Sequence, residues 1–108
     1  MVRYEIDAEA LSAAFVVLWE RMSAEAASLS PSEIVQRSAE EWSEEEACMR
    51  AGSVSEALRC VVRAELWESL SFGYDVLEAA RSVALAVRDW RMFHQLPAGE
   101  VWVVSVGD

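Results

Sequence analysis

The chain has 108 residues, with 19 Asp and Glu against nine Lys and Arg, and a net charge of −10. Hydrophobic residues make up 54% of it, which is typical of one folded domain (residues 1–108) and not of a disordered chain. The negative charge argues against direct binding to nucleic acid or to an anionic membrane surface, because both need positive charge on the protein. It permits a basic protein partner or bound cations.

Two further features bound the chemistry and the compartment. The chain contains no lysine, which excludes lysine Schiff bases and P-loop chemistry. No cationic, apolar leader precedes the first predicted strand, and no uncharged run approaches the roughly 18 residues that a membrane-spanning helix needs. We therefore expect a cytoplasmic protein in which Cys48 and Cys60 are reduced, with a Cys48–Cys60 disulfide as the alternative.

The first predicted elements are a strand and a long helix. Apolar and polar side chains alternate over residues 2–6, which predicts a short strand. Asp7 can then cap a helix over residues 8–29. The middle of this helix is apolar nearly all round, which is typical of a central helix and, alternatively, of a dimer interface.

Three more helices are predicted by the residues that can cap their first turns. They cover residues 31–51, 54–72 and 76–96. Ser30 with Glu33, and Ser53 with Glu56, have the spacing of a capping box, in which each side chain bonds to the other residue's backbone N–H. Asp75 can cap the last helix in the same way. These residues predict where the helices begin.

The β-branched and aromatic residues at 100–106 predict a C-terminal strand. The predicted fold class is therefore α+β, mostly α: a four-helix bundle-like core with a short N-terminal and a C-terminal strand that pair. A lone two-stranded pair is marginally stable, and a bare edge at 100–106 would favour aggregation. This favours packing of the strands on the helices, or a homodimer.

The stretch at 40–46 holds five Glu in seven residues. Neighbouring Glu residues at i,i+4 repel one another by a few tenths of a kcal/mol, so helix propensity alone does not explain them. At 100° per residue, one side of the predicted helix is apolar. That side holds Val35, Ser38, Ala39, Trp42 and Met49, with Glu46 beside Trp42, and the opposite side holds Arg37 with Glu40, Glu41, Glu44 and Glu45.

The favoured functional hypothesis is a small acidic protein that binds and masks or inhibits a basic, nucleic-acid-binding partner. Such an acidic strip could occupy the partner's nucleic-acid groove and steer association, as phage inhibitors, immunity proteins and antitoxins do as a class. The expected partner-binding residues are Glu40, Glu41, Glu44 and Glu45, with Trp67 as an exposed interface anchor. The alternative is a helix face that is only solvated.

The alternative function is enzymatic and rests on a carboxylate set. Glu65 and Glu68 fall on the apolar side of their predicted helix, where carboxylates are costly unless paired or bound to a cation. If the two central helices form a hairpin around Gly52, Glu65 and Glu68 lie level with residues 36–40, and Glu41 and Glu44 lie about one turn further on. Four such carboxylates could hold Mg²⁺ or Mn²⁺, which prefer oxygen ligands.

The spacing of these residues also resembles that of a known family. Glu40-Glu41-Trp42-Ser43-Glu44, followed after twenty residues by Glu65-Leu66-Trp67-Glu68, is similar to the E-E-x-x-E … E-x-x-D pattern of the all-α nucleoside triphosphate pyrophosphatases (MazG-like). The resemblance implies a Mg²⁺ cofactor and hydrolysis of nucleoside triphosphates to monophosphates and pyrophosphate. Glu68 stands where the family has Asp, and the two terminal strands are not part of that fold.

Two structural alternatives remain for these charged side chains. Arg37 or Arg91 could neutralise Glu65, Glu68 or Glu46 in an internal ion-pair network, which leaves no metal site. His94, the single histidine, lies at the end of the predicted helix over 76–96, where we expect a packed or capping side chain rather than a catalytic one.

Overall fold

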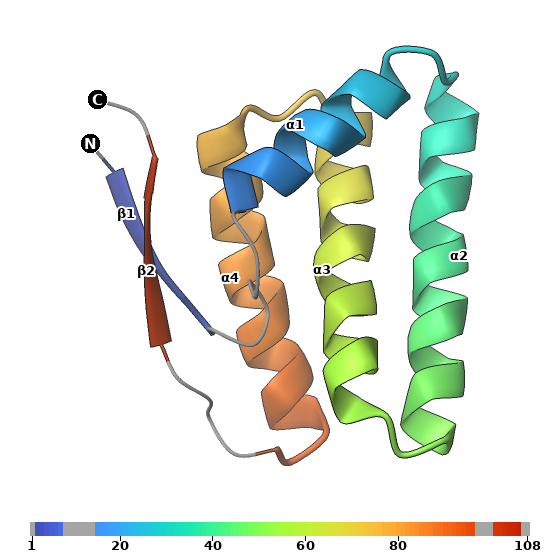
Figure 1. Ribbon diagram of the computed structural model, residues 1–108, viewed down its shortest axis with the longest axis vertical. Coiled ribbons are helices and arrows are strands. Elements are labelled where there is room, and N and C mark those ends of the chain that lie inside the picture. Colours follow the sequence, from blue (N-terminus) through green and yellow to red (C-terminus); the bar gives the residue numbers. More distant parts are fainter. Residues whose placement is uncertain (1, 8–14, 97–100, 107–108) are drawn as a thin grey trace.

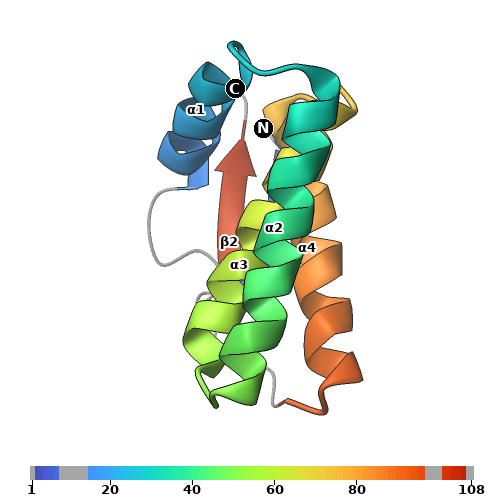
Figure 2. The same ribbon diagram turned by 90° about the vertical axis from the view of Figure 1, so that its right-hand side faces the viewer.

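The computed structural model describes residues 2–7, 15–96 and 101–106, and its side chains over 15–96. The elements are β1 (Val2–Asp7), α1 (Phe15–Ala26), α2 (Pro31–Arg50), α3 (Val54–Ser71), α4 (Val76–Phe93) and β2 (Val101–Val106) (Figure 1). Helices α2, α3 and α4 run beside one another, and α1 crosses near one end of α3. Turned by 90°, the molecule shows α1 and α4 on opposite sides of the α2–α3 pair (Figure 2).

The predicted α+β class is wrong. The packed body at residues 15–96 consists of four helices and contains no strand. Strands β1 and β2 lie outside this body beside α4, antiparallel, with Val2 opposite Val106 (Figure 1). Two strands form a single ladder and not a layer, so the helices must bury their apolar surface against one another. The expected start of the first helix falls on residues 8–14, which lie outside the described part of the chain.

The three helices begin after Ser30, Ser53 and Asp75 as predicted, but the side-chain cap bond forms in only two of the three places. Ser30 accepts a hydrogen bond from the Glu33 N–H at 3.2 Å, and the Glu33 carboxylate accepts one from the Ser30 N–H at 3.0 Å, which confirms the first capping box. Asp75 Oδ1 accepts from the backbone N–H three residues later at 2.9 Å. The second predicted box is wrong, because Ser53 makes no side-chain cap bond and Glu56 pairs instead with an arginine on the same helix.

Gly52 determines the geometry of the α2–α3 hairpin. Its φ of 78° lies in the left-handed region that residues with a Cβ avoid. The Gly52 N–H donates to the Met49 carbonyl, and the Ser53 N–H donates to the Cys48 carbonyl at 2.8 Å. The chain therefore reverses within a few residues, and α3 returns along α2.

Helix α3 lies at the centre of the core. Five of its side chains are fully buried at 0% exposure: Ala57, Leu58, Val61, Ala64 and Leu66. Four of them, all but Ala64, pack in one cluster with residues of α1, α2 and α4, among them Phe15, Ile34 and Val83. Because α3 is covered by the other helices, any site on it must lie at a gap between two of them.

Candidate functional site

Helix α2 packs on α3 through a different face than its sequence suggests. Its buried side chains are Ile34, Ser38 and Glu45, while Val35 is 56% exposed. At 100° per residue, this face is turned by roughly 60° from the predicted one. The Ser38 hydroxyl donates to the carbonyl oxygen of Ala64 at 3.0 Å, and these two small residues let the helices approach closely. This rotation buries Glu45 and partly buries Glu41, whereas Glu40 and Glu44 stay exposed.

The four predicted acidic residues of α2 therefore occupy three environments. Glu40 and Glu44 are exposed on the outer face of the helix. Glu41 is half-buried, with a side chain 22% exposed, and accepts a hydrogen bond from Arg63 Nε at 3.1 Å. Glu45 is buried in the core, so its assignment to the surface is wrong. Only Glu40 and Glu44 remain fully available to a partner.

Glu45 connects α2 to α4. Its Oε1 accepts a hydrogen bond from Trp90 Nε1 at 3.4 Å and lies 3.9 Å from His94 Nε2. His94 forms the C-cap of α4 and packs against the Trp90 ring, with centroids 5.2 Å apart, which confirms a packed, capping histidine. The Glu45 carboxylate is thus held in the interior of the protein by its contacts with Trp90 and His94.

Trp67 is also buried, and its role as an exposed anchor is wrong. Its side chain is 5% exposed. The guanidinium of Arg37 lies 5.6 Å from its ring centroid and pairs with Glu25 at 2.5 Å, so α1 and α2 together cover the indole. The sequence pattern of α3 alone could not reveal this cover, because it comes from two other helices.

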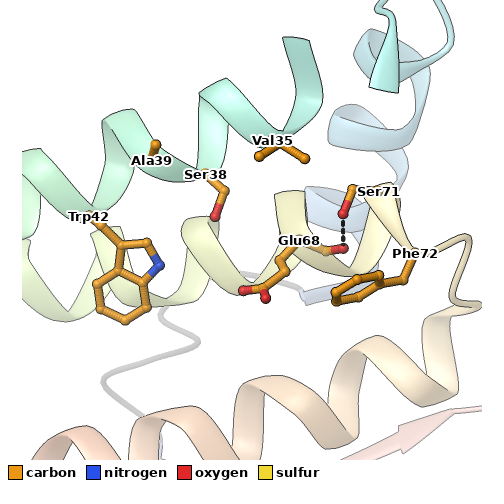
Figure 3. A pocket seen from close by; sticks show the side chains of 7 residues that line it. All are labelled: Val35, Ser38, Ala39, Trp42, Glu68, Ser71 and Phe72. Atoms are coloured by element: carbon orange, nitrogen blue, oxygen red, sulfur yellow. Dashed lines mark hydrogen bonds between the residues drawn. The ribbon is translucent and has the colours of Figure 1, made fainter. Parts of the chain in front are cut away.

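A groove opens on the other side of the α2–α3 pair. We call it the α2–α3 groove; Val35, Ser38, Ala39, Trp42, Glu68, Ser71 and Phe72 line it. Its volume is about 340 Å³, and its walls are mainly apolar, with Phe72 63% exposed. Figure 3 shows the Glu68 carboxylate between the rings of Trp42 and Phe72. The groove therefore combines exposed apolar surface with a carboxylate at its centre.

Glu65 lies one turn before Glu68 on α3. Burial raises the pKa of Glu65 to about 7, and the negative charge of Glu68 adds to this shift. Within residues 15–96, neither carboxylate forms an ion pair. Arg37, one expected neutralising partner, pairs with Glu25 instead. Within residues 15–96, these two neighbouring carboxylates therefore have no paired cation.

The structure does not bring the four proposed metal ligands together. Glu41 pairs with Arg63 and Glu44 is exposed on the outer face of α2, whereas Glu68 lines the α2–α3 groove on the other side of the helix pair. Within the described residues, no three His, Cys, Asp or Glu side chains form a group that could hold a metal ion. The hairpin of α2 and α3 matches the expectation, but Glu41 and Glu68 lie on opposite sides of it.

The two cysteines are free thiols on neighbouring helices. Cys60 is buried, and burial raises its pKa to about 11. Because the thiolate is the reactive form, a thiol with so high a pKa is a poor nucleophile at neutral pH. We assign no chemistry to Cys48 or Cys60.

The sequence predicted the positions of the groove residues only in part. Val35, Ala39 and Trp42 were placed on one apolar side of α2, but as core rather than as groove walls. That side spans roughly 100° of the helix, no more than one buried stripe needs, so its width gave no sign of a groove. Phe72, which closes the other end of the groove, carried no signal, because it follows the last residue of α3.

Comparison with protein-family models, with curated protein sequences and with solved structures finds no match. Among the helices of residues 15–96, none combines the length and the apolar character needed to cross a bilayer.

Proposed function

We propose that this protein binds a basic protein partner and masks or inhibits it, with the outer face of α2 as the docking surface. The observation that carries the proposal is the pair Glu40 and Glu44, one turn apart on that face. Both are exposed, and within residues 15–96 neither forms an ion pair. A net charge of −10 on 108 residues adds a long-range field that attracts a basic partner.

Glu41 belongs to the border of this surface. Its ion pair with Arg63 partly neutralises it, so we expect it to contribute less than Glu40 and Glu44. Glu45 and Trp67 belong to the core and take no part. The docking surface is thus smaller than the acidic stretch in the sequence suggests.

Electrostatic steering of this kind acts mainly on association and weakens with salt. An arginine-rich peptide of about 20 residues is a suitable probe, with its affinity measured by titration calorimetry at low and at physiological ionic strength. We expect the Glu40→Gln/Glu44→Gln variant to bind about tenfold more weakly at low salt, since two charges at an interface contribute on the order of 1.4 kcal/mol.

The matched control is Glu20→Gln/Glu78→Gln, which removes the same charge from exposed positions on α1 and α4. If this control weakens binding as much as Glu40→Gln/Glu44→Gln does, the attraction comes from net charge alone, and the outer face of α2 is not the docking surface.

A further inference from the structure

The α2–α3 groove is a second surface, distinct from the outer face of α2. At 100° per residue, its wall residues Val35 and Ala39 lie roughly 140° around α2 from Glu40 and Glu44. We propose that this groove binds one arginine side chain of a partner protein, presented on a segment with apolar residues on both sides. The proposal stands independently of the docking surface on the outer face.

The apolar walls of the α2–α3 groove favour its being covered by a partner protein rather than by solvent alone. Val35 is 56% exposed and Phe72 63% exposed, although both are large hydrophobic residues. Trp42 and Ala39 continue the same surface along α2 (Figure 3). A volume of about 340 Å³ is at the lower end of the range of about 300–1,000 Å³ for ligand sites, which suits one long side chain and its neighbours.

The carboxylates determine the charge of the occupant. Glu68 lies between two aromatic rings, and Glu65 lies one turn away, largely removed from water. A carboxylate in apolar surroundings is stabilised when a cation pairs with it. Within residues 15–96, no arginine pairs with either carboxylate, so the cation must come from outside this part of the chain.

The two rings favour arginine over lysine. A guanidinium is planar, pairs with a carboxylate through two parallel N–H groups, and stacks on aromatic faces. The protein already uses this contact elsewhere, since the Arg37 guanidinium lies over the ring of Trp67. A guanidinium placed against Glu68 would have Trp42 on one side and Phe72 on the other (Figure 3).

Binding of a cation should also release a proton. A positive charge beside Glu65 favours its ionised form, and Glu68 is the charged group that acts on Glu65 in the free protein. Within the described residues, no charged side chain of α2 or α4 pairs with Glu65. We therefore expect the arginine segment to bind more tightly at pH 8 than at pH 6.

The test uses a short blocked peptide, acetyl-Ala-Leu-Arg-Leu-Ala-amide, and a second peptide with citrulline, the neutral isostere of arginine. Binding is followed by NMR through the indole N–H of Trp42. We expect the arginine peptide to shift this resonance and the citrulline peptide to bind at least about tenfold more weakly. Glu68→Gln should weaken the arginine peptide about tenfold, while Glu20→Gln, at an exposed position of α1 outside both surfaces, changes its affinity less than about twofold.

Unchanged indole resonances of Trp67 and Trp90, which are buried, would show that Glu68→Gln still folds. Phe72→Ala provides a second variant at an exposed position and should also weaken the arginine peptide several-fold. The proposal is overturned if Glu20→Gln and Glu68→Gln weaken the peptide equally, or if Trp42 does not respond up to about 5 mM peptide. A lysine peptide that binds as well as the arginine peptide would overturn the assignment of arginine.

Discussion

The two sides of the α2–α3 helix pair differ in whether their carboxylates form ion pairs. On one side, which we call the closed side, Glu41 pairs with Arg63. Arg37 covers Trp67 there and pairs with Glu25 of α1. Each of these carboxylates has a cation, and the aromatic ring is covered.

The side with the α2–α3 groove is different. Glu65 and Glu68 have no ion pair within residues 15–96, and Val35 and Phe72 are exposed. Both sides are built from the same two helices, so the excess of Glu in the sequence does not by itself explain the contrast. The closed side has the character of a completed interior, and the groove side has the character of an interface without its partner.

The largest difference between the two sides should appear when an aromatic residue is removed from each. We expect Trp67→Ala to lower the free energy of unfolding by about 3–5 kcal/mol, because a buried indole leaves a cavity. Phe72→Ala should lower it by less than about 1 kcal/mol, since its ring is mostly in water already. Urea denaturation of both variants measures these values, and equal losses would contradict the contrast.

Removing a charge from each side should give a smaller difference with opposite signs. Arg63→Gln leaves Glu41 half-buried without its cation, and we expect a loss of about 1–2 kcal/mol. Glu68→Gln removes a charge that has no partner in the described residues, and should be neutral or slightly stabilising. A comparable loss in Glu68→Gln, measured in the same denaturation series, would mean that Glu68 is compensated in the folded protein.

The smallest expected effect depends on pH. The folded state raises the pKa of Glu65 from 4.5 to about 7, so it binds this proton more tightly than the unfolded chain does. Ionising Glu65 therefore costs stability, and the cost grows as pH rises from about 4.5 to about 7 and is complete above. We expect Glu65→Gln to be more stable than the native chain by about 1 kcal/mol at pH 8, a value discounted for the partial exposure of the carboxyl group.

At pH 4 the same two proteins should be equally stable, because Glu65 is then protonated in both the folded and the unfolded chain. Thermal unfolding at both pH values measures the difference. A constant difference between pH 4 and pH 8 would show that the substitution acts through packing and not through charge.

Local signals in the sequence predicted the helices well. Ser30 and Asp75 cap their helices because capping needs only a side chain and the next turn of backbone. Gly52 reverses the chain for an equally local reason. Ser53 shows the limit of such signals, because the residues of a capping box are present and the cap bond does not form.

The site depended on contacts that a helical wheel does not contain. Glu45 is buried because Trp90, 45 residues later, donates to it. Trp67 is buried because Arg37 and α1 cover it. A helical wheel locates the apolar side of α2 from the residue types alone. The face of α2 that packs on α3 follows instead from the close packing of Ser38 on Ala64. A rotation of roughly 60° was enough to move Glu45 inwards and Val35 outwards.

The most direct test of the contrast between the two sides is the pKa of Glu65 in the free protein. The side-chain carboxyl carbons of a ¹³C-labelled sample are followed by NMR as pH is varied, with Glu65→Gln used to assign the resonance. An uncompensated, partly buried carboxylate beside Glu68 predicts a midpoint near 7. A midpoint near 4.5, the ordinary value, would show that Glu65 is solvated or paired, and would contradict the account of the groove as a site that lacks its cation.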